Sequence, residues 1–184
     1  LTGTEINDQH RNEIESISDD ATFYTYPIKD IPGKFDIISM IHVLEHIINP
    51  KPFLSEIRNK LSDTGFLIIE IPDHEQNPFD LVIADHCTHF SNKSLENILH
   101  KSGLEIVVST SCCVPKEKLF IIKKGGYINN IHKELAQADI KLVRDLLDCH
   151  VAWLGNISNM VKPLSCLNEF GIFGTSIAGT WLYA

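Results

Sequence analysis

The chain has 184 residues, of which 43% are hydrophobic and 22% charged, enough for a real core and ordinary for a soluble protein. Its formal net charge of -8 without a Lys/Arg-rich block argues against nucleic acid as a partner, and no apolar run approaches the roughly 20 residues of a membrane span. The five cysteines form no C-x-x-C pair and are odd in number, which favours reduced thiols and a cytoplasmic location.

The first part of the chain predicts two short strands with a helix between them. Residues 1–6 (LTGTEI) and 21–25 (ATFYT) are the predicted strands. Asn7 or Asp8 can cap the helix, with Ile14 and Ile17 on its inner face.

Glu5 ends the first predicted strand. A carboxylate in this position can accept two hydrogen bonds from the vicinal hydroxyls of a ribose. The alternative is an acid at a strand end that faces water.

Residues 34–73 predict a strand, a crossover helix and a second strand. Residues 35–41 form an apolar run typical of a strand buried on both faces. Pro50 opens a helix, Gly65 is placed where that helix stops, and residues 66–71 form the next strand. This order predicts a βαβ unit of a parallel sheet.

A polar cluster follows the first strand of this unit. His42, Glu45 and His46 lie just past its carboxyl end, where open α/β sheets bind ligands. Their ordinary role is to hold the turn between strand and helix, and direct catalysis is the alternative.

Several spaced features of this stretch resemble one enzyme family. The segments FDIISMIHVLEHIINP and GFLIIEIPD are similar to the core of class I S-adenosylmethionine-dependent methyltransferases. In that family Phe-Asp opens an apolar strand, Leu-Glu-His enters the helix, and a Gly-x-Leu strand ends in Pro. The resemblance, which runs from residue 1 to about residue 124, implies a Rossmann-like α/β sheet, mostly parallel with an antiparallel edge.

The resemblance also implies a cofactor and the residues that hold it. The cofactor is S-adenosylmethionine, with Glu5 on the ribose, Ile28 over the adenine, and Ile6, Met40 and Ile41 in the remaining contacts. The family's first strand and Gly-rich loop would precede residue 1, so the resemblance predicts a fragment that lacks both and binds the cofactor weakly.

The loop of residues 73–91 is rich in histidine and acid. The segment Asp85-His86-Cys87-Thr88-His89-Phe90-Ser91 resembles the acid–His pair, aromatic and Phe-Ser of sugar C-methyltransferases. This resemblance makes His86 a candidate base that Asp85 orients, with His89 beside it in the catalytic set.

Two other interpretations of this loop remain open. His86, Cys87 and His89 could bind zinc, although structural zinc sites usually draw ligands from two separated pairs and no second pair is evident. The histidines could also only fix the backbone of the loop. The predicted site therefore contains no metal.

The remaining sequence predicts a sheet edge and then a change of character. We expect a helix over residues 92–102 that stops at Gly103, then strands 104–109 and 118–123 as an antiparallel edge pair. A long helix and a second helical piece (residues 151–161) follow. Residues 172–173 form a strand that leads into Gly174-x-Ser176-x-x-Gly179, a variant of the dinucleotide fingerprint.

These patterns predict two units. Residues 1–126 form a truncated methyltransferase domain, and residues 127–184 form a helical linker and the start of a second Rossmann-like α/β unit, similar to the domain appended to many sugar C-methyltransferases. The predicted function is methyl transfer from S-adenosylmethionine to a small-molecule acceptor such as a nucleotide-linked sugar. The alternatives are a nucleotide-binding or oxidoreductase module, and a non-catalytic methyltransferase-like scaffold.

Overall fold

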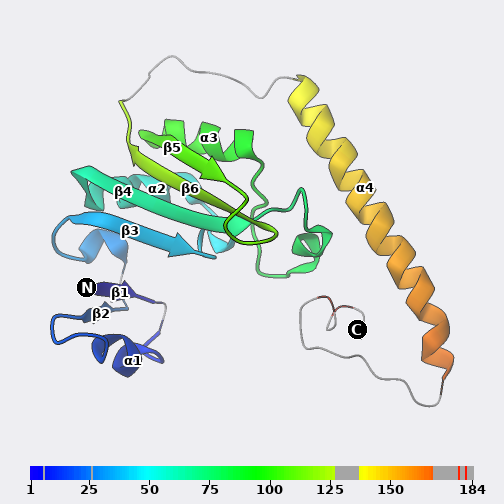
Figure 1. The fold of residues 1–184 in the computed structure, drawn as a ribbon, viewed down its shortest axis with the longest axis horizontal. Coiled ribbons are helices and arrows are strands. Elements are labelled where there is room, and N and C mark those ends of the chain that lie inside the picture. Colours follow the sequence, from blue (N-terminus) through cyan, green and yellow to red (C-terminus); the bar gives the residue numbers. More distant parts are fainter. Residues whose placement is uncertain (6, 26, 127–136, 168–177, 179–180, 182–184) are drawn as a thin grey trace.

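The computed structural model describes residues 1–5, 7–25, 27–126, 137–167, 178 and 181 (Figure 1). The first two-thirds of the chain contain six strands and three α-helices among the described residues, and a long helix follows. The elements are β1 (Thr2–Thr4), α1 (Arg11–Glu15), β2 (Thr22–Tyr24), β3 (Phe35–Ile41), α2 (Pro50–Lys60), β4 (Leu61–Pro72), α3 (Asn92–Lys101), β5 (Leu104–Thr110), β6 (Glu117–Lys124) and α4 (Gln137–Val161). Short 3-10 turns are η1 (Ile28–Asp30), η2 (Leu44–His46), η3 (Pro78–Val82) and η4 (Lys162–Cys166).

The strands form two sheets. β1 pairs with β2 in parallel, and the larger sheet has the order β3-β4-β6-β5. β3 and β4 are parallel, whereas β6 is antiparallel to both of its neighbours, so β3, β4 and β5 all run in one direction. The predicted α/β fold, with a mostly parallel sheet and an antiparallel pair at its edge, is confirmed.

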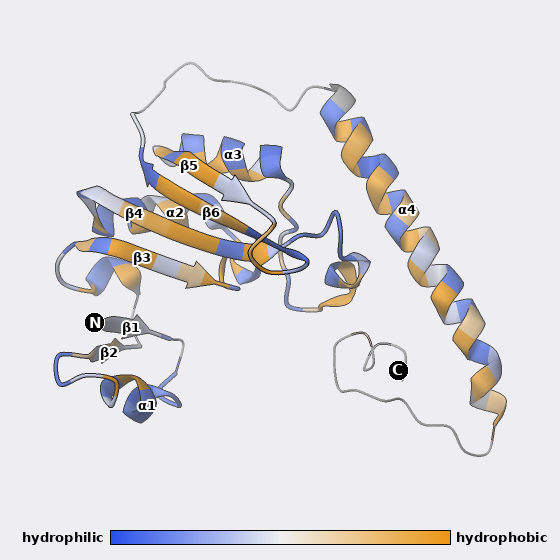
Figure 2. Cartoon of the chain, in the orientation of Figure 1, coloured by the Kyte–Doolittle hydropathy of each residue, from blue (hydrophilic) through white to orange (hydrophobic). Residues whose placement is uncertain are grey.

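One face of the larger sheet carries the core. Leu54 and Ile57 of α2 and Leu95 and Leu99 of α3 pack against alternate residues of β4 and β6. Figure 2 shows the apolar residues concentrated along β3, β4 and β6. This burial of one apolar stripe per helix against one sheet face is the main source of stability.

The prediction that residues 35–41 are buried on both faces is wrong. Met40 lies in the core, but the exposed fraction is 66% for Ile37 and 48% for Ile41. The physical reason is that α2 and α3 both pack against the opposite face, on which Met40 lies, whereas Ile37 and Ile41 remain exposed.

Gly65 does not end a helix, as the sequence pattern predicts. α2 ends at Lys60, and Gly65 lies within β4. A Cβ atom at Gly65 would come within 2.9 Å of the carbonyl oxygens of Phe35 and Asp36. Glycine therefore permits the close approach of β4 to β3 at this point.

Both ends of α3 agree with the predicted helix. At its start, the side chain of Ser91 caps the helix by accepting a hydrogen bond from the backbone N–H of Ser94. Gly103 follows with a φ of 71°, the left-handed conformation typical of a residue just past a helix end. Its carbonyl accepts a hydrogen bond of 2.9 Å from Nε of Arg58, which joins the end of α3 to α2.

The N-terminal helix is shorter than predicted. α1 begins at Arg11, and Ile14 packs near Gly3 of β1, where an added Cβ would lie 2.8 Å from Cγ2 of Ile14. Ile17 was expected on the same inner face, but its exposed fraction is 66%. The helix ends at Glu15, so Ile17 is not part of the helix and does not lie on its inner face.

α4 is one continuous helix where the sequence predicts two pieces. Near its middle, the ring of Trp153 meets that of Phe79 from η3 edge to face at 5.4 Å. No helix in the described part of the chain is long and apolar enough to cross a membrane. The predicted strand at residues 172–173 and the glycine fingerprint at 174–179 fall outside the described residues, apart from residue 178.

Candidate active site

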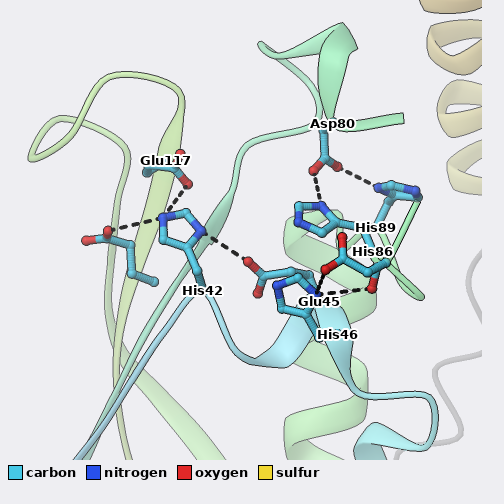
Figure 3. Close-up of polar contacts among 9 residues, drawn as sticks. His42, Glu45, His46, Asp80, His86, His89 and Glu117 are labelled. Carbon is cyan, nitrogen blue, oxygen red and sulfur yellow. Dashed lines mark hydrogen bonds and ion pairs between the residues drawn. The ribbon is translucent and has the colours of Figure 1, made fainter. Parts of the chain in front are cut away.

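Ionisable side chains from separate segments meet at one edge of the larger sheet (Figure 3). His42 follows the carboxyl end of β3, and β4 ends at Pro72 on the same edge. Glu117 begins the antiparallel β6 directly opposite Pro72, so it reaches this edge too. The chain then returns over the edge in the loop of residues 73–91.

This loop is anchored at its start by a buried cation. Nζ of Lys118 lies 3.0 Å from the carboxylate of Asp73 and 2.8 Å from that of Glu75. The backbone N–H of Asp73 also donates a 2.8 Å hydrogen bond to the carbonyl of Lys116. These contacts tie the loop to β6. The sequence reading did not find them, because the partners are about 45 residues apart.

His42 stands at the centre of three carboxylates. Its φ of 52° is uncommon outside glycine. Nδ1 lies 3.1 Å from Glu45, while Nε2 lies 3.8 Å from both Glu70 and Glu117. A residue held in a sparsely populated backbone conformation is typical of functional sites.

The carboxyl of Glu117 is shifted toward its neutral form. Burial raises its pKa, and the negative charges of Glu70 and Glu45 raise it further, against the opposing effect of His42. This edge of the sheet therefore concentrates negative charge.

Asp80, from η3, binds two histidines at once. Its side chain is 3% exposed, and its two oxygens lie 2.7 Å from Nδ1 of His86 and 2.5 Å from Nδ1 of His89. Burial opposes ionisation of Asp80, but the hydrogen bonds with His89 and His86 outweigh it and hold its pKa below the usual value. Because a carboxylate only accepts hydrogen bonds, each histidine donates from Nδ1.

The structure changes the partner that sequence reasoning gave His86. Asp85 was expected to orient His86, but its carboxylate lies 3.4 Å from Nδ1 of His46 and is 76% exposed. Asp80 takes that place on His86. The partner was missed because η3 folds back on the loop, and no local pattern shows that fold.

Two groups of side chains could hold a metal ion. They are Glu45 with His46 and His86, and Asp80 with His86 and His89; within each group the ligand-capable atoms lie within 4.8 Å of one another. The rings of His46 and His86 meet edge to face at 4.8 Å. Oε2 of Glu45 is buried without a hydrogen-bond partner among the described residues.

The predicted cofactor residues occupy different environments. Glu5 is exposed just after β1, and its backbone N–H donates to the carbonyl of Tyr24 at 3.1 Å. Ile28 lies half-buried in η1, and Ile41 is 48% exposed. The side chain of Met40 belongs to the core, and Met40 is paired with Ile69 of β4 within the sheet. Ile6 lies outside the described residues.

The parallel strands and the covering helices together define a Rossmann-like α/β fold. A family model described as a methyltransferase domain matches residues 2–109, and the chain belongs to this family. No curated protein sequence matches the chain.

Solved structures support the same fold. An S-adenosylmethionine-dependent methyltransferase from Clostridium acetobutylicum is similar with a TM-score of 0.56 and 13% identity, over 68% of this chain and 75% of that one. The mitomycin 7-O-methyltransferase is similar with a TM-score of 0.57 and 16% identity, over 67% of this chain and 41% of that one. An O-methyltransferase of neocarzinostatin biosynthesis, solved with S-adenosylmethionine and 2-hydroxy-5-methyl naphthoic acid, gives a TM-score of 0.57 at 13% identity over 67% and 41% of the two chains. S-adenosylmethionine, the predicted cofactor, is thus the methyl donor named for proteins of this fold.

Proposed function

We propose that this protein transfers a methyl group from S-adenosylmethionine to a small-molecule acceptor, such as a nucleotide-linked sugar, and that residues 1–126 form the domain that does so. The observation that carries the proposal is the concentration of ionisable side chains at the carboxyl ends of β3 and β4. Ligands bind at this edge in open α/β sheets. The mitomycin and neocarzinostatin enzymes, which are similar in fold, are named for small-molecule chemistry of this kind.

In this proposal the cofactor lies between β1 and β3. Glu5 follows β1 and accepts hydrogen bonds from the two ribose hydroxyls, while Ile28 and Ile41 offer apolar contact. The carboxylates around His42 favour the positive sulfonium group, since fixed negative charge attracts it in a partly buried site.

The reaction itself is a displacement at carbon. A lone pair of the acceptor forms a bond to the methyl carbon as the carbon–sulfur bond breaks, and the bonding electrons remain on sulfur, which becomes a neutral thioether. The acceptor loses a proton, which a positioned imidazole can take up. His89 and His86 both present a hydrogen-bonded Nδ1 to Asp80, which leaves Nε2 of each neutral ring as the basic nitrogen.

The two histidines differ in access to an acceptor. The side chain of His89 is 28% exposed, whereas that of His86 is 7% exposed. His89 is therefore the better placed of the two to receive a proton, with Asp80 as its positioning residue. The exposed Asp85 contacts His46 and does not contact His86 or His89 through its carboxylate in any of the ion pairs of the described residues.

The cofactor assignment is tested with Glu5→Gln in the full-length protein. Loss of charged hydrogen bonds to the ribose should weaken S-adenosylmethionine binding by about 1–3 kcal/mol, measured by isothermal titration calorimetry. Glu13→Gln, which changes an exposed acid of α1, is the matched control and should leave affinity unchanged. Equal affinities for the two variants would remove Glu5 from the site.

The acceptor assignment is tested with methyl-labelled S-adenosylmethionine and a panel of nucleotide-linked sugars and small phenols. Transfer of label to a low-molecular-weight product supports the proposal. Label found only on protein or nucleic acid would contradict it.

A further inference from the structure

We propose that Glu45, His46 and His86 bind a divalent transition-metal ion such as Zn²⁺. Glu45 and His46 lie in η2, directly after β3, and His86 lies in the loop that returns over the sheet edge. Their ligand-capable atoms are within 4.8 Å of one another. Two imidazoles and one carboxylate form a ligand set that zinc and other divalent transition metals use when positions stay open for other ligands.

One oxygen of the Glu45 carboxylate has a hydrogen-bond partner among the described residues, and the other is free to bind a metal ion. Nδ1 of His42 lies 3.1 Å from Oε1, and the carboxylate is 3% exposed. Oε2 is buried and has no hydrogen-bond partner among the described residues. A buried carboxylate oxygen without a partner costs free energy, and a cation at this oxygen removes that cost.

The two histidines are held in the tautomer that leaves Nε2 free to bind a metal. Nδ1 of His86 donates to the carboxylate of Asp80, and Nδ1 of His46 lies 3.1 Å from the carbonyl oxygen of Asp85. Both partners accept hydrogen bonds only, so Nδ1 carries the proton and Nε2 keeps its lone pair in each neutral ring. Metal-bound histidines almost always donate their other N–H in this way.

The second histidine group is less suited to a metal. Both oxygens of Asp80 are already hydrogen-bonded, to His86 and His89. Cys87, which the sequence offers as a zinc ligand, is exposed, and its thiol lies 3.6 Å from the carbonyl of Asp85. The unsatisfied oxygen of Glu45 therefore distinguishes the first group.

Backbone hydrogen bonds hold the two halves of the proposed site together. The carbonyl of Glu45 accepts from the backbone N–H of Cys87 at 2.7 Å and from that of Thr88 at 3.1 Å. Tetrahedral ligands of one ion at about 2.1 Å lie about 3.4 Å apart. The ligand atoms of the three side chains therefore need to close by at most about 1.4 Å to bind an ion.

The ion would leave coordination positions for another ligand. An acceptor hydroxyl bound there would lose its proton more easily, because a divalent cation lowers the pKa of a bound oxygen. This use of the ion rests on the proposed function, whereas the binding of the ion does not.

The experiment measures metal binding without S-adenosylmethionine. Metal-free protein is titrated with Zn²⁺ by calorimetry and with Co²⁺ by visible absorption, which reports the coordination of the ion. We expect one ion per chain. His46→Ala and Glu45→Gln should each lower the affinity by more than about 100-fold, and Asp80→Asn should lower it by about 10–100-fold as a change outside the direct ligands.

Two controls separate this site from other metal binding. His10→Ala removes an exposed histidine that belongs to neither metal-capable group, and Cys87→Ser removes the neighbouring thiol; both variants should bind Zn²⁺ as the wild type does. Folding of every variant is checked by thermal unfolding. The proposal is overturned by a wild type that binds no stoichiometric ion, by binding that survives His46→Ala, or by loss of binding in Cys87→Ser. Cofactor affinity measured in the same metal-free protein tests the proposed function separately.

Discussion

Asp80 is expected to be the most important polar residue for the stability of the site. Asp80→Asn keeps its shape but leaves only one oxygen to accept a hydrogen bond, so the amide N–H₂ must face either His86 or His89. Each charged hydrogen bond contributes about 1.5–3 kcal/mol and a neutral one about 0.5–1.5 kcal/mol. One charged bond is lost and the other becomes neutral.

Relief from burying a charge offsets part of this loss. The direction of the Asp80 pKa decides the balance: it is lowered despite burial, so the two hydrogen bonds outweigh the cost of burying the carboxylate. We therefore expect Asp80→Asn to lower the free energy of unfolding by about 2–4 kcal/mol at pH 7. Urea unfolding with linear extrapolation measures this change.

The pH dependence gives a second readout. A carboxyl whose pKa is lowered by folding contributes stability that is present above its ordinary value of 3.8 and is lost as the pH falls through the lower, folded-state pKa. The difference between wild type and Asp80→Asn should therefore be full at neutral pH and should shrink below about pH 4.

Asp85→Asn is the matched control, because it makes the same chemical change in the same loop. Its side chain is 76% exposed, and surface changes of this kind stay within about 0.5 kcal/mol. The reasoning fails if Asp80→Asn is no more destabilising than Asp85→Asn, or if the difference does not vary with pH.

Two further predictions concern stability. Gly103→Ala should destabilise the fold by about 1–3 kcal/mol in chemical unfolding, because φ is positive and the added Cβ would lie 2.7 Å from Nε of Arg58, whereas Gly126→Ala, with open space around it, should be nearly neutral. Equal effects would contradict this account. Burial lowers the pKa of His74 below 6.5, so the folded state favours neutral imidazole and stability should fall as the pH drops below 6.5. His74→Gln should lose less stability than the wild type over this interval, and parallel pH profiles would show that His74 titrates alike in both states.

Sequence reasoning worked best where the signal is local. Pro50 begins α2, Gly103 follows α3, and the bounds of β3 agree with the apolar run at residues 35–41. Such signals depend on the backbone preferences of a few neighbouring residues. Gly65 shows the limit of this approach, since its role is a close approach to β3 and not a helix end.

The candidate site was predicted only in part. The sequence identified the loop and its histidines, and it placed Glu45 and His46 at a strand end. It did not identify Asp80 as the partner of His86 and His89, or bring His46 to the loop. His46 and Asp85 are 39 residues apart, and no local pattern joins them.

The sequence by itself determined the class of fold and the edge of the sheet at which the chemistry is proposed, because hydrophobic periodicity and the order of strands and helices can be recognised from neighbouring residues. Only the tertiary structure decided which carboxylate is hydrogen-bonded to which histidine and which face of β3 is covered. It also left one buried oxygen of Glu45 without a partner in the described residues. These features depend on how the loop of residues 73–91 packs on η2 and β6, and long-range packing of this kind is settled by the sum of many weak contacts across the fold.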